Sequence, residues 1–196
     1  MAKTAKFDRQ DVVDKATNLY WEKGFHATSM RNIQDVINMR PGSIYASFGS
    51  KEGLFKESLQ QYADINLAGI EALREQATSP LGALRTLMER SVIESRQSAP
   101  NGMCMLVKTI AELTDENSEL LGEAKRLLHD VEKSLEKIVD DAKACGEIDC
   151  SNDSARVARY FQVQLMGVRT YANSHDDEGV INQLIDDVFN SPLLRV

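Results

Sequence analysis

The placement of proline is the feature of this sequence that most constrains its fold. The chain has only four: Pro41, Pro80, Pro100 and Pro192. Apolar residues recur instead at steps of three and four, as in the run Ala124, Leu128, Val131, Leu135, Ile138 and Ala142. Since proline interrupts helices, and since this spacing lines one helical face without strand-like alternation, the sequence predicts an all-α fold of about nine helices.

Charge is unevenly distributed along the chain. Residues 1–56 contain nine Lys and Arg against six Asp and Glu, a net charge of +3, whereas the whole chain of 196 residues carries −7. A basic end on an acidic protein favours a polyanionic partner for that end alone, and random charge scatter is the alternative. The longest apolar run, residues 103–107, is far shorter than the roughly 18 residues that a membrane helix needs. With no signal segment and three cysteines, we expect a cytoplasmic protein without a membrane partner.

Three short helices are expected at the amino end, over about residues 8–23, 28–38 and 41–48. Thr28 or Ser29 can cap the second of them. Pro41 suits a first helical position because it lacks an amide hydrogen, and Asn38 tolerates the left-handed backbone of a tight corner. Two short helices joined by such a turn form a helix-turn-helix, whose second helix can enter a major groove about 12 Å wide. A fourth helix over about 51–76 then begins with Lys51 and free amide groups, both suited to phosphate.

Two stretches of this region resemble the TetR family of transcriptional regulators. The first reads GFHATSMRNI over residues 24–33, and the second has Gly42, Tyr45, Phe48, Lys51, Glu52, Leu54 and Phe55 in the order typical of the family. The match covers about residues 8–56, and the remainder is similar only in helix count and length. The resemblance implies a helix-turn-helix domain over 1–50 and a helical effector-binding and dimerisation domain over 51–196, linked by the helix 51–76. It also implies a homodimeric repressor that a small-molecule or electrophile inducer releases from its operator in double-stranded DNA.

The resemblance further implies which residues meet DNA. Tyr45 and Lys51 match positions that hold phosphates, and Gly42 and Ser43 match positions that approach base edges. Thr28 matches a threonine that often lies near the DNA backbone. The alternative for Tyr45 is that it packs in the core.

Three positions depart from the family pattern: Arg40 stands where a small capping residue is usual, Ser47 where histidine is common, and Asn38 where glycine is common. Arg40 could contact a phosphate or read a guanine. Arg31 could contact a phosphate or be a solvated surface charge. The full set of expected DNA-contacting residues is Thr28, Ser29, Arg31, Arg40, Gly42, Ser43, Tyr45, Ser47 and Lys51.

Cys104 is a candidate chemical sensor. It follows Pro100 and Gly102, where a helix is expected to begin, so that its thiol would lie in the first turn. The helix dipole and Lys108, four residues on, would then favour the reactive thiolate. Regulators that resemble this chain and carry a cysteine near the start of their sixth helix offer a loose parallel. The alternative is that Cys104 is a small apolar core residue between two methionines.

The second domain is expected to hold the effector and the dimer interface. A helical bundle of this size commonly leaves a cleft, although core packing is the alternative for any single lining residue. The expected lining or sensing residues are Cys104, Met88, Met103, Met105, Phe161, Met166 and Tyr171. The last two helices, over about 153–174 and 177–190, carry apolar residues on more than one face, so that one face needs a partner. The residues expected in the dimer interface are Val157, Met166, Leu184 and Val188.

Other classes of function find little support in the sequence. The closest glycines, Gly49 and Gly53, are too far apart for a phosphate-binding loop, and the histidines and cysteines lack metal-site spacing. We therefore expect no metal, no cofactor and no catalytic residue, because an enzyme using Cys104 as nucleophile would lack a histidine base at a recognisable spacing. The main alternative is a helical adaptor that binds protein, although it would need neither a basic amino end nor Lys51 at a helix start.

Overall fold

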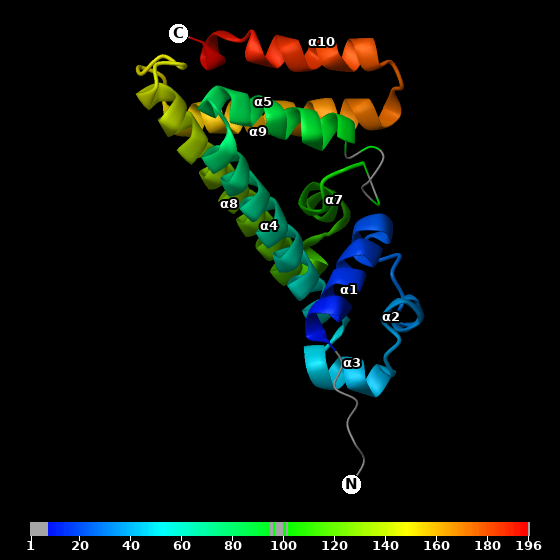
Figure 1. Cartoon of the computed structure of the whole chain (residues 1–196). Helices are drawn as coiled ribbons and strands as arrows, with labels where there is room; N and C mark the ends of the chain where they lie inside the picture. The colour runs from blue at the N-terminus through cyan, green and yellow to red at the C-terminus, as the bar shows by residue number, and fades with distance from the viewer. Residues whose placement is uncertain (1–7, 95, 97–99, 101, 196) are drawn as a thin grey trace. The chain divides into compact units, whose positions relative to one another are not determined.

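The computed structural model describes residues 8–94, 96, 100 and 102–195. Over these residues the chain forms nine α-helices, a π-helical segment and two short 3-10 segments, with no strand (Figure 1). The predicted all-α fold of about nine helices is confirmed. Within the same residues, no helix is long and apolar enough to cross a bilayer.

The chain divides into two compact units that differ from the predicted domains. Unit 1 runs through Asp64 and takes in Met105–Leu127, whereas unit 2 comprises Ile65–Cys104 and the chain from Leu128 onward. The boundary predicted at residue 50 separated the amino-terminal helices from everything after them. In the structure these helices share unit 1 with Met105–Leu127, a segment distant in the sequence. Residues of this segment contribute to the candidate site.

Local capping signals set the limits of the first three helices of unit 1. Helix α1 (Arg9–Lys23) begins after Asp8, whose carboxylate accepts two amide hydrogens, and ends at Gly24 with φ 87°. Helix α2 (Met30–Ile37) is capped by Ser29 and ends at Asn38, which has the predicted left-handed backbone with φ 52°. Helix α3 (Pro41–Phe48) has Pro41 at its start. Each end thus follows from a side chain or a backbone preference that the sequence displays.

Unit 1 is completed by the first half of α4 (Lys51–Gln76), by α7 (Met105–Glu112) and by the start of α8 (Ser118–Ala144). A short 3-10 segment, Asp115–Asn117, joins the last two. The core of unit 1 is aromatic. The centre of the Phe55 ring on α4 lies 4.7 Å from the centre of the Tyr20 ring and 5.0 Å from that of the Phe25 ring. These three side chains are almost fully buried.

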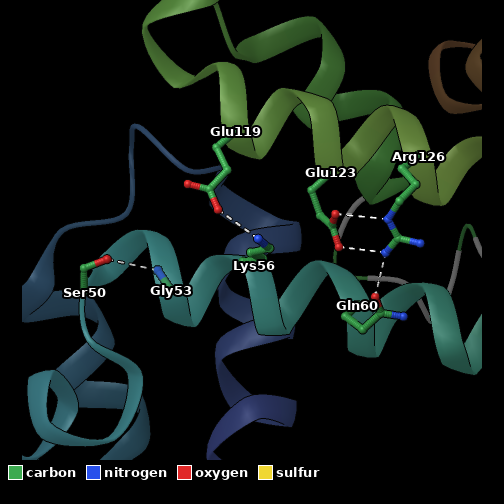
Figure 2. Close-up of polar contacts among 7 residues, drawn as sticks. All are labelled: Ser50, Gly53, Lys56, Gln60, Glu119, Glu123 and Arg126. Atoms are coloured by element: carbon green, nitrogen blue, oxygen red, sulfur yellow. Dashed lines mark hydrogen bonds and ion pairs between the residues drawn. The ribbon is translucent and has the colours of Figure 1, made fainter.

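Exposed polar contacts join α4 and α8 within unit 1 (Figure 2). Lys56 Nζ lies 2.8 Å from a carboxylate oxygen of Glu119. Arg126 donates to Glu123 on its own helix and, at 2.9 Å, to the side-chain oxygen of Gln60 on α4. An exposed ion pair contributes at most about 1 kcal/mol to stability. We therefore attribute the packing of α4 against α8 in unit 1 chiefly to their buried residues.

Unit 2 contains α5 (Pro80–Glu89), the π-helical Arg90–Glu94, α9 (Ser154–Ser174), α10 (Glu178–Phe189) and the 3-10 segment Pro192–Leu194. Helix α10 lies alongside α9 and contacts α5 (Figure 1). The second halves of α4 and α8 belong to the same unit and are joined by Arg74, which binds both carboxylate oxygens of Asp141. The hydrogen bonds that Arg74 donates to Asp141 raise the pKa of its guanidinium.

Candidate nucleic-acid interface

Helix α3 separates its side chains into a buried face and an exposed face. Ile44 is fully buried and Phe48 is 7% exposed, so both anchor the helix in the core of unit 1. Gly42, Ser43 and Tyr45 are exposed, with Tyr45 at 49%. Tyr45 is therefore not a core residue, and the face that it shares with two small residues is free of bulk near the start of the helix.

Arg9 of α1 fixes the carboxyl end of α3. Its guanidinium donates a hydrogen bond of 3.1 Å to the carbonyl oxygen of Ser47 and lies 4.5 Å from the centre of the Phe48 ring. The same group forms an ion pair of 2.5 Å with Glu57 of α4. Ser47 is half-buried, and its carbonyl group has this internal partner.

Three further residues of the predicted contact set are exposed around α2 and α3. Arg31 and Arg40 are both exposed, and the Arg40 side chain does not cap α3 although it occupies the cap position. Of the two predicted capping candidates it is Ser29 that caps α2, because its hydroxyl accepts the amide hydrogen of Asn32 at 3.2 Å. Ser29 also donates to the Asn32 side chain, so its hydroxyl is already engaged at the helix start.

Thr28 and Lys51 do not present their side chains as predicted. Thr28 is fully buried, and its hydroxyl donates to the carbonyl of Gly24 at 2.6 Å. The Lys51 ammonium donates to the carbonyl of Phe25 at 2.7 Å and lies 4.2 Å from the centre of that ring. Burial lowers the pKa of Lys51, and the carboxylates of Glu52 and Glu112 oppose this effect. Both side chains therefore support the turn between α1 and α2.

The same turn is bound by two side chains for which the sequence predicted no role there. Lys108 and Glu112 of α7 bind the backbone of residues 21–26, although Phe25 and Glu112 lie 87 positions apart in the chain. The available signal was their spacing, since residues four apart share one face of a helix. Nothing local indicated which segment that face meets.

Two protein-family models match this chain. The model for bacterial regulatory proteins of the tetR family matches residues 12–58, which include most of α1, all of α2 and α3, and the start of α4. The model for the tetracyclin repressor-like C-terminal domain matches residues 80–187. The chain belongs to the TetR family. It is accordingly a DNA-binding transcriptional regulator, not an enzyme.

Individual relatives agree with this assignment. The chain is 26% identical over 165 residues to the HTH-type transcriptional repressor ComR of Escherichia coli K12, covering 83% of this chain and 78% of ComR. It is 35% identical over 102 residues to the repressor BdcR of the same organism, about half of each chain. A solved structure of a cysteine mutant of the TetR family regulator CifR, complexed with 26bp double-strand operator DNA, has a TM-score of 0.86 at 20% identity, covering 97% of this chain and 99% of CifR. That likeness establishes the shared TetR fold.

The predicted effector residues of this TetR-family chain differ in burial and belong to both units. Met88 and Phe161 are fully buried in the core of unit 2, and Met105 is 1% exposed in unit 1. These three side chains pack in the cores of two different units, so their role as ligand contacts stays a prediction. Met103 and Met166 are half-buried, and Tyr171 is 36% exposed and stacked on His175 at 3.9 Å.

Cys104 keeps only one of the two features that favoured a reactive thiol. Helix α7 begins at Met105, so Cys104 directly precedes the first turn and still lies at the amino end of the helix dipole. Lys108 was expected to share a face with it, but the Lys108 ammonium donates to carbonyl groups of Trp21 and Glu22. Cys104 is half-buried, whereas Cys145 and Cys150 are exposed. Among the described residues, no three His, Cys, Asp or Glu side chains are grouped so as to hold a metal ion.

We expect Cys104 to alkylate more slowly than Cys145 and Cys150. Exposure controls access of a small electrophile, and the ammonium nearest in sequence is bound elsewhere. The measurement is the rate of iodoacetamide modification of each cysteine, followed by peptide mass spectrometry across a range of pH. Modification of Cys104 several-fold faster than of the exposed pair would contradict this expectation and support the thiol as a sensor.

The predicted dimer residues are also divided by burial. Val157 is fully buried and Val188 is 3% exposed, and both lie in the core of unit 2, so their prediction as interface residues is corrected. Met166 and Leu184 are half-buried. The exposed large apolar side chains on the last two helices are Val163, Tyr171 and Val180.

Proposed function

We propose that the chain is a repressor that inserts α3 into the major groove of an operator. The observation that carries the proposal is the exposed face of α3, where Gly42 and Ser43 leave room beside Tyr45 while Ile44 and Phe48 hold the opposite face in the core. Small residues on the leading turn allow base edges to approach the backbone, and a tyrosine hydroxyl can bind a phosphate. Because operator DNA lies in the cytoplasm of a bacterium, we propose that location as well.

The proposed DNA contacts comprise seven of the nine predicted residues. They are Ser29, Arg31, Arg40, Gly42, Ser43, Tyr45 and Ser47, all exposed or half-buried. Thr28 and Lys51 are assigned to the support of the helix-turn-helix because their polar groups bind Gly24 and Phe25.

We further propose that the repressor acts as a homodimer joined through α9 and α10. Val163 is 52% exposed, Tyr171 36% and Val180 37%, so α9 and α10 leave large apolar side chains outside the core that a partner subunit can cover. A dimer presents two α3 helices, whose centres must lie about 34–36 Å apart to enter successive major grooves. Met166 and Leu184 remain candidates for this interface.

An effector would release the operator by shifting the population of dimer conformations. A ligand that binds two conformations equally shifts neither, so the inducer must prefer the conformation that does not fit DNA. Partly exposed residues such as Met103, Met166 and Tyr171 are the proposed contacts for a small molecule. Modification of Cys104 by an electrophile is the second form of this proposal, and the alkylation rates above test it.

The central experiment is selection of bound DNA. The purified protein is mixed with random genomic fragments, the retained fragments are sequenced, and binding to the recovered site is measured against salt. A steep loss of affinity with rising salt supports the repressor, because released counterions report phosphate contacts. The adaptor alternative predicts no retained site and no such dependence.

Arg40→Ala should weaken binding to the recovered operator about tenfold and reduce the salt slope by about one. The exposed Arg40 guanidinium is proposed to hold one phosphate, so its loss should affect all sequences alike. The matched control is Arg156→Ala, which removes an exposed arginine from unit 2. Loss of preference at a single guanine, with an unchanged slope, would instead assign Arg40 to base reading.

A further inference from the structure

The turn between α1 and α2 takes its hydrogen-bond partners from side chains. A helix leaves its last carbonyl groups without internal partners, and a tight turn leaves amide groups in the same condition. Lys108 of α7 donates to the carbonyls of Trp21 at 3.1 Å and Glu22 at 2.7 Å, which belong to the last turn of α1. Its charge is also favourably placed at the carboxyl end of a helix dipole.

Glu112, on the next turn of α7, binds the opposite kind of group in the same segment. One carboxylate oxygen accepts the amide hydrogen of Phe25 at 3.0 Å, and the other accepts that of His26 at 2.7 Å. Together Lys108 and Glu112, which we call the α7 clamp, bind four backbone groups within six residues. Hydrogen bonds to charged partners are roughly twice as strong as neutral ones.

Gly24 shows that the turn and the clamp are fitted to each other. Its φ of +87° is a left-handed value, and a Cβ built there would lie 2.5 Å from a carboxylate oxygen of Glu112. Any side chain at this position would displace the carboxylate. The glycine therefore serves the approach of Glu112 as well as the end of α1.

Two further side chains, one before α2 and one at the start of α4, also bind the backbone of this turn. Thr28 donates to the carbonyl of Gly24, and Lys51 donates to that of Phe25. Phe25 itself is 4% exposed, so these polar groups lie where water cannot readily replace a lost partner. The direction in which the chain leaves α1 and enters α2 thus depends on contacts supplied by α7.

We propose that Lys108 and Glu112 are positioning residues for operator binding. They touch no DNA. By holding the α1–α2 turn they keep α2, and α3 after it, in the arrangement that fits a major groove. The proposal rests on the proposed function. If only a fraction of molecules keeps that arrangement, the apparent affinity falls by the same fraction.

Glu112→Gln separates this proposal from general electrostatics by the sign of its effect. Removing a carboxylate makes unit 1 more positive, which by itself should tighten binding to a polyanion. A glutamine of the same shape offers one acceptor oxygen to two amides, so the clamp predicts binding weakened about tenfold. The matched control is Glu116→Gln, an exposed glutamate of the same unit, which should bind as tightly as the unaltered chain or more tightly.

Lys108 supplies an independent pair of variants. Lys108→Met keeps the length of the side chain and should weaken operator binding about tenfold, whereas Lys108→Arg can still donate to both carbonyls and should restore most of the affinity. Lys125→Met removes an exposed lysine from α8 in the same unit and controls for the lost charge. These variants also decide the question should Glu112→Gln fail to fold.

Amide hydrogen exchange gives a readout that DNA affinity does not. The amides of Phe25 and His26 should exchange at least about tenfold faster in Glu112→Gln than in the unaltered chain, while those of α3 keep their protection. Operator binding by Glu112→Gln and Lys108→Met as tight as that of their controls would overturn the proposal. If the unaltered chain binds no operator, the proposed function itself fails. If the control variants bind operator more weakly than the clamp variants, only the proposal for the α7 clamp is overturned.

Discussion

Gly53→Ala is expected to destabilise unit 1 by about 2–3 kcal/mol and to abolish operator binding at concentrations where the unaltered chain is saturated. A Cβ at position 53 would lie 2.0 Å from the carbonyl oxygen of Phe48, the last residue of α3. That atom belongs to the backbone and cannot rotate aside as a side chain would. The corner between α3 and α4 must therefore open, and with it the orientation of the DNA-reading helix changes.

The geometry of this corner explains why the effect should be large. Figure 2 shows Ser50 beside Gly53 at the start of α4, where the Ser50 hydroxyl accepts the Gly53 amide hydrogen at 3.1 Å. Leu54, which follows, is fully buried, so the helix start cannot shift outward without loss of core contacts. The substitution thus acts on the cap and the core together.

Gly69→Ala is the matched control in the same helix. Nothing lies within 4 Å of a Cβ at that position, and alanine is favoured over glycine in a helix by up to about 1 kcal/mol. Urea unfolding should find Gly69→Ala as stable as the unaltered chain or more stable, and Gly53→Ala clearly less stable. Equal stability of the two variants would show that the α3–α4 corner adapts without cost.

Helix ends were predictable because their causes are local. Asp8 and Asp153 each accept amide hydrogens two or three residues on, and Asn38 adopts the left-handed backbone that its short polar side chain allows. Each of these interactions spans less than one turn. A sequence pattern therefore contains all the information that they need.

The direction of long side chains was not predictable, because their partners are distant in the sequence. Lys51 stands at the start of α4, where a phosphate contact was expected, but its four-carbon chain carries the ammonium back to Phe25, 26 residues earlier. The partners of the α7 clamp were also not predictable from the sequence. The spacing of Lys108 and Glu112 marks a helical face, and only the folded chain shows that this face meets the α1–α2 turn.

Periodicity does not separate core residues from residues of a ligand site or a dimer interface. Met88, Phe161 and Val157 lie on apolar faces of their helices, as predicted, but those faces meet inside unit 2. Both a packed core and a ligand cleft require an apolar helical face, so the pattern alone is the same for each. The exposed Val163 and the buried Val157 lie on one helix and were not distinguishable by residue type.

The largest loss of stability is expected for Phe161→Ala, about 3–5 kcal/mol in unit 2. The Phe161 side chain is fully buried, and its ring lies 6.1 Å from that of Phe189 in an edge-to-face arrangement. Truncation removes the apolar burial and leaves a cavity that fixed helices cannot fill. The experiment is urea unfolding at one protein concentration, because the stability of a dimer depends on concentration.

Phe161→Leu is the matched variant, since it retains most of the apolar volume and should cost about 1–2 kcal/mol. The size of the step from leucine to alanine decides between the two roles considered for this residue. A tightly packed core gives a steep step, because each lost methylene group leaves space that nothing occupies. A residue that lines a ligand cavity already borders empty space, so a loss below about 1 kcal/mol for Phe161→Ala would return Phe161 to the list of effector contacts.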